Sequence, residues 1–121
     1  THVIASADAL REATGQQNLA EGLRALARHY RGFLAVTNGP EGVTWRDGDA
    51  VRHMDAFKIE AVDTLGAGDT FHGAFALGLA EGWELARNLR FANAAAALKC
   101  TRFGGRLGAP TRAEVEAYLR A

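Results

Sequence analysis

Residues 63–69, Asp-Thr-Leu-Gly-Ala-Gly-Asp, join two segments with different apolar patterns. Before them, residues 59–62 form a short, mostly apolar run that predicts a strand, and after them residues 70–80 are apolar on nearly every side, which predicts a buried helix. At a strand-to-helix junction, backbone N–H groups and the positive end of the helix converge on one point. The segment therefore predicts an anion-binding loop, in which Gly66 and Gly68 allow a close approach of the backbone.

The rest of the chain alternates between strand-like and helix-like segments. Strands are expected at residues 2–5, 33–36, 43–46 and 50–53, and the last two form a hairpin around residues 47–49. Helices are expected at residues 18–30, from residue 84 to about 102, and after a capping box of Thr111 and Glu114. Strands that alternate with helices predict an α/β fold, with a mostly parallel sheet and helices on both faces.

The length of 121 residues fits a single domain. Fourteen Lys and Arg residues balance fourteen Asp and Glu residues, so no net field attracts nucleic acid or an anionic membrane, and we expect neither as a partner. The single cysteine, Cys100, cannot form an internal disulfide, and no run of eighteen apolar residues is present. These features favour a cytoplasmic location.

Asp69 follows the glycines and enters the first turn of the expected helix. A carboxylate in that place can accept a proton from a hydroxyl group that attacks a bound phosphate. The simpler alternative is a glycine turn in which Asp69 only compensates the helix dipole. Two other phosphate-binding motifs are excluded, because Phe71 stands where a dinucleotide fingerprint needs glycine, and no Gly-Lys-Ser/Thr follows as in a Walker A loop.

Residues 63–73, Asp-Thr-Leu-Gly-Ala-Gly-Asp-Thr-Phe-His-Gly, resemble the C-terminal signature of the ribokinase-like (PfkB) sugar kinases. Residues 37–42, Thr-Asn-Gly-Pro-Glu-Gly, are similar to the Thr-x-Gly-x-x-Gly nucleotide loop of that family, and residues 91–97 to its adenine-side helix. Residues 100–111 match the end of the family pattern, so the resemblance covers nearly the whole chain. It implies the C-terminal, nucleotide-binding and catalytic part of a ribokinase-like core.

The resemblance implies ATP-dependent phosphorylation of a hydroxyl group on a small sugar or sugar-like substrate. By position, Asp69 would be the general base, and Gly66, Ala67 and Gly68 would form the anion hole. The residues implied to bind the nucleotide are Thr37, Asn38, Gly39, Gly42 and, against the adenine base, Asn93. For Asn93, the alternative role of a hydrogen-bonded core amide stays open at this stage.

The resemblance also implies metal ions. Mg²⁺ is expected with ATP, held largely by phosphates and water. A monovalent cation, K⁺, would be bound through Asp63 and through backbone carbonyl groups of Leu65, Lys99, Arg102 and Gly104. The alternative for Asp63 is a hydrogen-bonding role toward the amides of its own loop.

Two departures from the family pattern keep other functions open. Family members are more than twice this long, and the portion that supplies most sugar contacts and the lid over the substrate is not among these residues. The family's Asn-x-x-Glu motif is replaced by residues 6–9, Ser-Ala-Asp-Ala, where Asp8 is a partial substitute at best. The alternatives are a nucleotide-binding module or inactive kinase fragment, and a structural subunit that binds nothing.

An uncovered sheet edge also predicts a homodimer or association with an N-terminal part.

Overall fold

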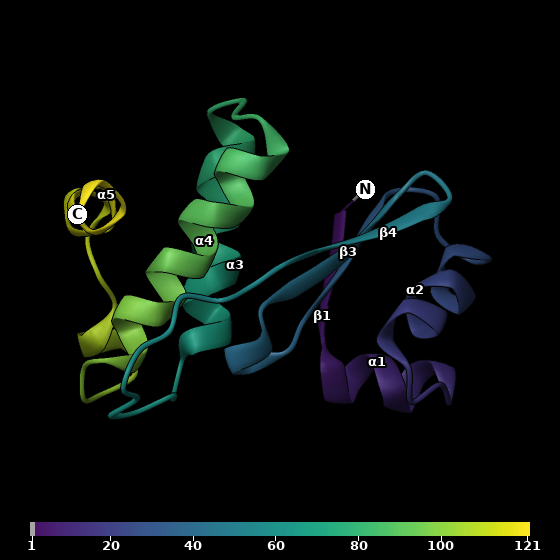
Figure 1. The fold of residues 1–121 in the computed structure, drawn as a ribbon, viewed down its shortest axis with the longest axis horizontal. Coiled ribbons are helices and arrows are strands. Elements are labelled where there is room, and N and C mark those ends of the chain that lie inside the picture. Colours follow the sequence, from purple (N-terminus) through teal and green to yellow (C-terminus); the bar gives the residue numbers. More distant parts are fainter. Residues whose placement is uncertain (1) are drawn as a thin grey trace. The chain divides into compact units, whose positions relative to one another are not determined.

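The chain divides between Asp55 and Ala56 into two units. The computed structural model describes residues 2–121 (Figure 1). Within these residues the first unit contains strands β1–β4 with helices α1 and α2, and the second contains helices α3, α4 and α5. No helix in residues 2–121 combines the length and the apolar character that a membrane crossing requires.

The sheet of the first unit has the strand order β1-β2-β3-β4. Its strands are β1 His2–Ser6, β2 Phe33–Thr37, β3 Val43–Asp47 and β4 Ala50–Met54. The α/β class is confirmed, but the sheet is mixed, because only the β1–β2 pair is parallel and the other two pairs are antiparallel. Five residues, 38–42, separate β2 from β3. A parallel connection needs a crossover of about a dozen residues or more, so this link can only reverse the chain.

The expected hairpin is confirmed as the antiparallel pair β3–β4, in which Val43 lies opposite Met54 and Asp47 opposite Ala50. Gly48 has a φ of 62° at the first of two loop positions. A type II′ turn requires a positive φ at that position, and its twist matches the twist of the flanking strands. The sequence Asp-Gly-Asp therefore fixes both the turn and the register of this edge.

Helices α1 (Ala7–Thr14) and α2 (Leu19–Ala27) bury their apolar side chains against one face of the sheet. Leu34 and Val36 alternate along β2 and so point to the same face, where they meet Leu10 and Leu23. All four side chains are at most 1% exposed. They form the core of the first unit.

The second unit is built around the pair of helices α3 (Ala67–Ala80) and α4 (Leu85–Cys100), which lie side by side (Figure 1). Helix α5 (Arg112–Arg120) adds Val115 to a core that contains Phe91, Ala94 and Ala95 of α4. The expected central helix and the capping box at the start of α5 are both confirmed.

Small residues on α3 have different environments. A Cβ atom at Gly78 would lie 2.2 Å from Oδ1 of Asn88, a buried side chain of α4. The position of the Asn88 side chain therefore requires glycine at position 78. At Gly73 no heavy atom outside the adjacent helix backbone lies within 4 Å of the corresponding position, so packing does not require glycine there.

Helix α3 is not buried on all sides, contrary to the sequence prediction. Phe71, Phe75 and Gly78 are buried, whereas Ala76 is exposed and Leu79 is 40% exposed. An apolar pattern on all sides shows that the whole surface of a helix is able to be buried. In this structure α4 packs against one side of α3, so the side chains on the other side stay exposed.

The strand expected at residues 59–62 is also wrong, because the segment has no regular structure. The N–H groups of Val62 and Asp63 both donate to the carbonyl oxygen of Cys100, at 2.7 and 3.1 Å. The last carbonyl groups of a helix have no partner within the helix, so they accept hydrogen bonds from N–H groups outside it. The segment is therefore fixed to the end of α4 and not to a neighbouring strand.

Candidate functional site

The loop formed by residues 63–66 leads directly into α3. Gly66 precedes the helix with a φ of 79°, a left-handed conformation that favours glycine. A Cβ atom there would also lie 3.4 Å from Cα of Gly105. The N–H group of Ala67 donates to the carbonyl oxygen of Thr64 at 3.1 Å, which closes the turn. The left-handed conformation therefore favours glycine at position 66, whereas a Cβ would make only ordinary van der Waals contact with Gly105.

The first turn of α3 presents backbone donors beside a carboxylate. Gly68 and Asp69 are exposed, and no side chain caps the start of the helix. Amide groups in a first helical turn have no acceptor within the helix. No heavy atom outside the adjacent helix backbone lies within 4 Å of a Cβ placed at Gly68, so the space beside its Cα is open. The structure thus brings the four predicted catalytic residues, Gly66 to Asp69, into one turn.

Asp63 ties loop 63–66 to a segment that follows α4. Its Oδ1 accepts a hydrogen bond from the N–H group of Leu65 at 2.9 Å, and its Oδ2 accepts one from Gly104 at 3.0 Å. The bond from Leu65, then the bond from Gly104, and the nearby charge of Lys99 lower the pKa of Asp63, while partial desolvation opposes the shift. Both carboxylate oxygens of Asp63 therefore accept hydrogen bonds, as the alternative interpretation of this residue expects.

Lys99 lies under the same loop and has no exposed surface. Its Nζ donates to the carbonyl oxygen of Asp63 at 2.8 Å and to that of Arg102 at 3.1 Å. The structure brings together the residues predicted to bind a monovalent cation, namely Asp63, Leu65, Lys99, Arg102 and Gly104. One of the predicted carbonyl groups, that of Arg102, and the carbonyl group of Asp63 accept hydrogen bonds from the ammonium group of Lys99.

The side chain of Lys99 is the functional feature that sequence reasoning missed. The sequence interpretation assigned only a backbone carbonyl to this residue. A signal was present, because Lys99 follows the apolar run of residues 94–98 and lysine is almost never fully buried unless it is paired. A lysine in such a run is a candidate for a buried, hydrogen-bonded cation.

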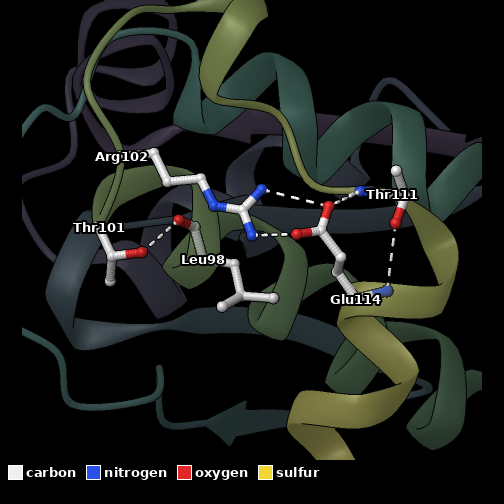
Figure 2. A network of polar contacts seen from close by, with 5 residues as sticks. All are labelled: Leu98, Thr101, Arg102, Thr111 and Glu114. Carbon is white, nitrogen blue, oxygen red and sulfur yellow. Dashed lines mark hydrogen bonds and ion pairs between the residues drawn. The ribbon is translucent and has the colours of Figure 1, made fainter.

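Arg102 and Glu114 form an ion pair beside this segment (Figure 2). Both terminal nitrogens of the guanidinium group donate to the carboxylate, and the N–H group of Thr111 donates to its Oε1 at 2.9 Å. The bonds from Arg102 and then Thr111 lower the pKa of Glu114 to about 2. The pair connects the end of α4 with the first turn of α5, and Arg102 is the member that the predicted capping box did not include.

The predicted nucleotide-binding residues of the first unit follow β2. Thr37 is the last residue of the strand, and residues 38–42 form a loop that is closed by its own hydrogen bonds. The N–H group of Asn38 donates to the carbonyl oxygen of Gly42 at 2.9 Å, and its Nδ2 donates to Oε2 of Glu41 at 2.6 Å. Gly39 and Gly42 have φ values of 49° and 101°. The glycines of the motif thus stand where the backbone is left-handed.

The remaining predicted positions lie elsewhere. Asn93 is on α4 and is only 6% exposed, as the core-amide interpretation requires. Ser6 takes the place of the asparagine in the Asn-x-x-Glu motif, and its Oγ caps α1 by accepting from the N–H group of Ala9 at 3.2 Å. Among residues 2–121, no three His, Cys, Asp or Glu side chains form a cluster that could hold a metal ion.

Comparison with protein families identifies the group to which this site belongs. The family described as pfkB family carbohydrate kinase matches residues 1–112. The chain belongs to this family. Among its curated relatives, the ribokinase of Bacillus subtilis (strain 168) is 48% identical over 90 residues, which cover 74% of this chain and 31% of the relative.

Solved structures confirm the ribokinase-like fold. A putative ribokinase from Agrobacterium tumefaciens aligns with a TM-score of 0.93 at 46% identity, over 99% of this chain and 40% of that chain. A double mutant of the Vibrio cholerae O395 fructokinase, solved with fructose, ADP and a potassium ion, aligns with a TM-score of 0.88 at 28% identity, over 97% of this chain and 40% of that one. The chain spans about a third of the length of the curated ribokinases it matches.

Proposed function

We propose that this chain is the nucleotide-binding and catalytic part of an ATP-dependent sugar kinase. The observation that carries the proposal is the first turn of α3, where open backbone donors stand beside the exposed carboxylate of Asp69. Membership of the PfkB family of carbohydrate kinases supports the same conclusion. The acceptor is a hydroxyl group of a small sugar or sugar-like compound.

Asp69 acts as the general base. Its carboxylate takes the proton from the acceptor hydroxyl as the oxygen attacks the γ-phosphorus of ATP, and the bond to the β,γ-bridging oxygen breaks to release ADP. A phosphoryl group in transfer carries charge on its equatorial oxygens, which backbone N–H groups stabilise. Gly66, Ala67 and Gly68 serve this purpose, although the N–H group of Ala67 also donates to the carbonyl oxygen of Thr64.

Each unit carries its own predicted nucleotide-binding residues. Loop 38–42 and Thr37 line the phosphates and ribose of ATP, and the backbone of this loop is preformed by its own hydrogen bonds. In the second unit, Asn93 is the residue that the family resemblance implies to contact the adenine base. Mg²⁺ would neutralise phosphate charge during transfer, and it would be held largely by phosphate oxygens and water.

The first test replaces the base. Asp69→Asn keeps the size of the side chain, so the intact protein should still bind ATP. Its kcat with ATP, Mg²⁺ and a panel of pentoses, hexoses and nucleosides should fall by about 10²–10⁴-fold, the usual contribution of a positioned base. Asp49→Asn, an exposed carboxylate in the β3–β4 turn, is the control and should leave kcat unchanged. A variant of Asp69 with full activity would overturn the proposed mechanism.

A second pair of variants separates kinase function from the two alternatives. Gly68→Val blocks the approach of phosphate, whereas Gly73→Val adds the same bulk to open space on the same helix. A kinase loses turnover only in the first variant. If ATP binds to the wild-type protein but no substrate is ever phosphorylated, the chain is a nucleotide-binding module. If ATP does not bind and both variants behave like the wild type, the loop is structural.

A further inference from the structure

The ammonium group of Lys99 is enclosed by protein. The residue has no exposed surface, although lysine is almost never fully buried without partners. The only donors that its side chain has are the three N–H bonds of Nζ. The carbonyl oxygens of Asp63 and Arg102 accept from this nitrogen, at 2.8 and 3.1 Å. The buried charge is therefore solvated by backbone carbonyl groups.

Backbone carbonyl oxygens are also the groups that replace the hydration shell of K⁺ in proteins. Here they come from two segments that are far apart in the sequence, the start of loop 63–66 and the turn after α4. The same two segments are joined a second time, through the bond from the N–H group of Gly104 to Oδ2 of Asp63. A cation at this point holds the loop that precedes α3 against the end of α4.

The stem of Lys99 is packed as tightly as its head group. A Cβ atom at Gly108 would lie 3.2 Å from Cδ and 3.3 Å from Cε of Lys99. The N–H group of Gly108 donates to the carbonyl oxygen of Gly104 at 3.1 Å, so the backbone folds around the aliphatic stem. The absence of a side chain at position 108 provides the space that this lysine occupies.

We infer that the Lys99 ammonium group is a built-in cation that takes the place of a bound monovalent metal ion beneath loop 63–66. The loop therefore keeps its conformation in the absence of K⁺. The consequence for catalysis, turnover that does not depend on K⁺, rests on the proposed kinase function. The structural consequence, a stability that does not depend on K⁺, does not.

The test measures thermal unfolding of the intact protein in KCl, NaCl and N-methyl-glucamine chloride at equal ionic strength. The wild-type protein should have the same Tm in all three salts. Lys99→Ala opens a space lined by carbonyl oxygens, so its Tm should be lower and should rise selectively with K⁺. Lys99→Met removes the charge but fills the space, so its Tm should be lower in every salt. A saturable increase of the wild-type Tm with K⁺ over Na⁺ would overturn the inference.

Two further outcomes are decisive. Equal K⁺ responses of the alanine and methionine variants would contradict the inference, because the response would then not come from the vacated space. If neither variant folds, the three-salt comparison of the wild-type protein decides alone. Turnover is measured in parallel in the same three salts. Absence of turnover in all of them contradicts the proposed kinase function, while the Tm comparison still tests the role of Lys99.

Discussion

Loop 38–42 and loop 63–66 both place glycines where the backbone is left-handed, but they are held in different ways. Loop 38–42 is fixed by bonds among its own residues, from Asn38 to Gly42 and to Glu41. Loop 63–66 has bonds of its own, from Leu65 to Asp63 and from Ala67 to Thr64, but it is also held by residues about forty positions away, through Gly104 and Lys99. The first conformation is a local property of its sequence, whereas the second also depends on α4 and the segment after it.

This difference predicts which changes in the protein disturb the conformation of each loop. A change that disturbs Gly104, Lys99 or the chain around them should release loop 63–66 without touching loop 38–42. A change in backbone conformation within residues 38–42 should have the opposite effect. Hydrogen exchange can report on each loop separately, because the N–H group of Asn38 bonds within the first loop and the N–H group of Gly104 bonds to the second.

The largest effect is expected from Gly108→Val, which should disrupt the contacts of Lys99 and Gly104 with loop 63–66. The new side chain would contact Cδ of Lys99 at 3.2 Å and Cβ of Arg102 at 3.3 Å, and both of these atoms belong to a packed segment. Insertion of carbon atoms into a packed region costs about 1–3 kcal/mol, and we expect the upper end of this range in urea unfolding. Exchange of the Gly104 amide should accelerate, while that of Asn38 should not. Equal acceleration of both amides would show that the loops are not independent.

A smaller effect is expected from Gly42→Ala, which should disturb the backbone conformation of loop 38–42. Gly42 has a φ of 101° and a ψ of −149°, a combination that is almost confined to glycine. The strain should destabilise the protein by about 2 kcal/mol in urea unfolding, within the ~1–3 kcal/mol typical of such conformations. Gly39→Ala is the matched control, because its φ of 49° is less demanding and no atom lies near the new Cβ. If the two variants lost equal stability, backbone conformation at position 42 would not be the cause.

The smallest effect is expected from the ion pair of Arg102 and Glu114, which lies beside the segment that holds loop 63–66. Because the pKa of Glu114 is lowered from 4.5 to about 2 in the folded protein, the pair contributes stability above pH 4.5. That contribution disappears as the pH falls toward 2. The Tm difference between the wild type and Glu114→Gln should therefore be constant above pH 5 and should shrink below it. A difference that persists unchanged at about pH 2 would contradict the assignment.

The same contrast explains how much the sequence could predict. The hairpin around Gly48 and the capping box at Thr111 depend on neighbours within a few residues, and both were predicted correctly. The strand expected at residues 59–62 and the role of the Lys99 side chain were not, because each depends on contacts between residues 36 or more positions apart. Apolar patterns show what a segment is able to bury, and they do not show which partner covers it.

The candidate site illustrates the same rule. The glycines and Asp69 of the first turn of α3 were predicted from a contiguous motif, and the structure brings them into one turn. The support beneath them was predicted as a metal site, since a buried ammonium group and a bound cation both use backbone carbonyl groups, which leave no side-chain pattern in the sequence. Only the position of Nζ between Asp63 and Arg102 distinguishes the two.

Cys100, whose carbonyl oxygen accepts two hydrogen bonds from the segment before loop 63–66, is also the only cysteine of the chain. Burial raises the pKa of its thiol, although the charge of Lys99 opposes the shift. Oxidants and alkylating reagents attack the thiolate form, which is scarce for such a group at neutral pH. The thiol of Cys100 should therefore resist peroxide and maleimide. A cysteine introduced at the surface could then be labelled selectively, because the native thiol would not compete for the reagent.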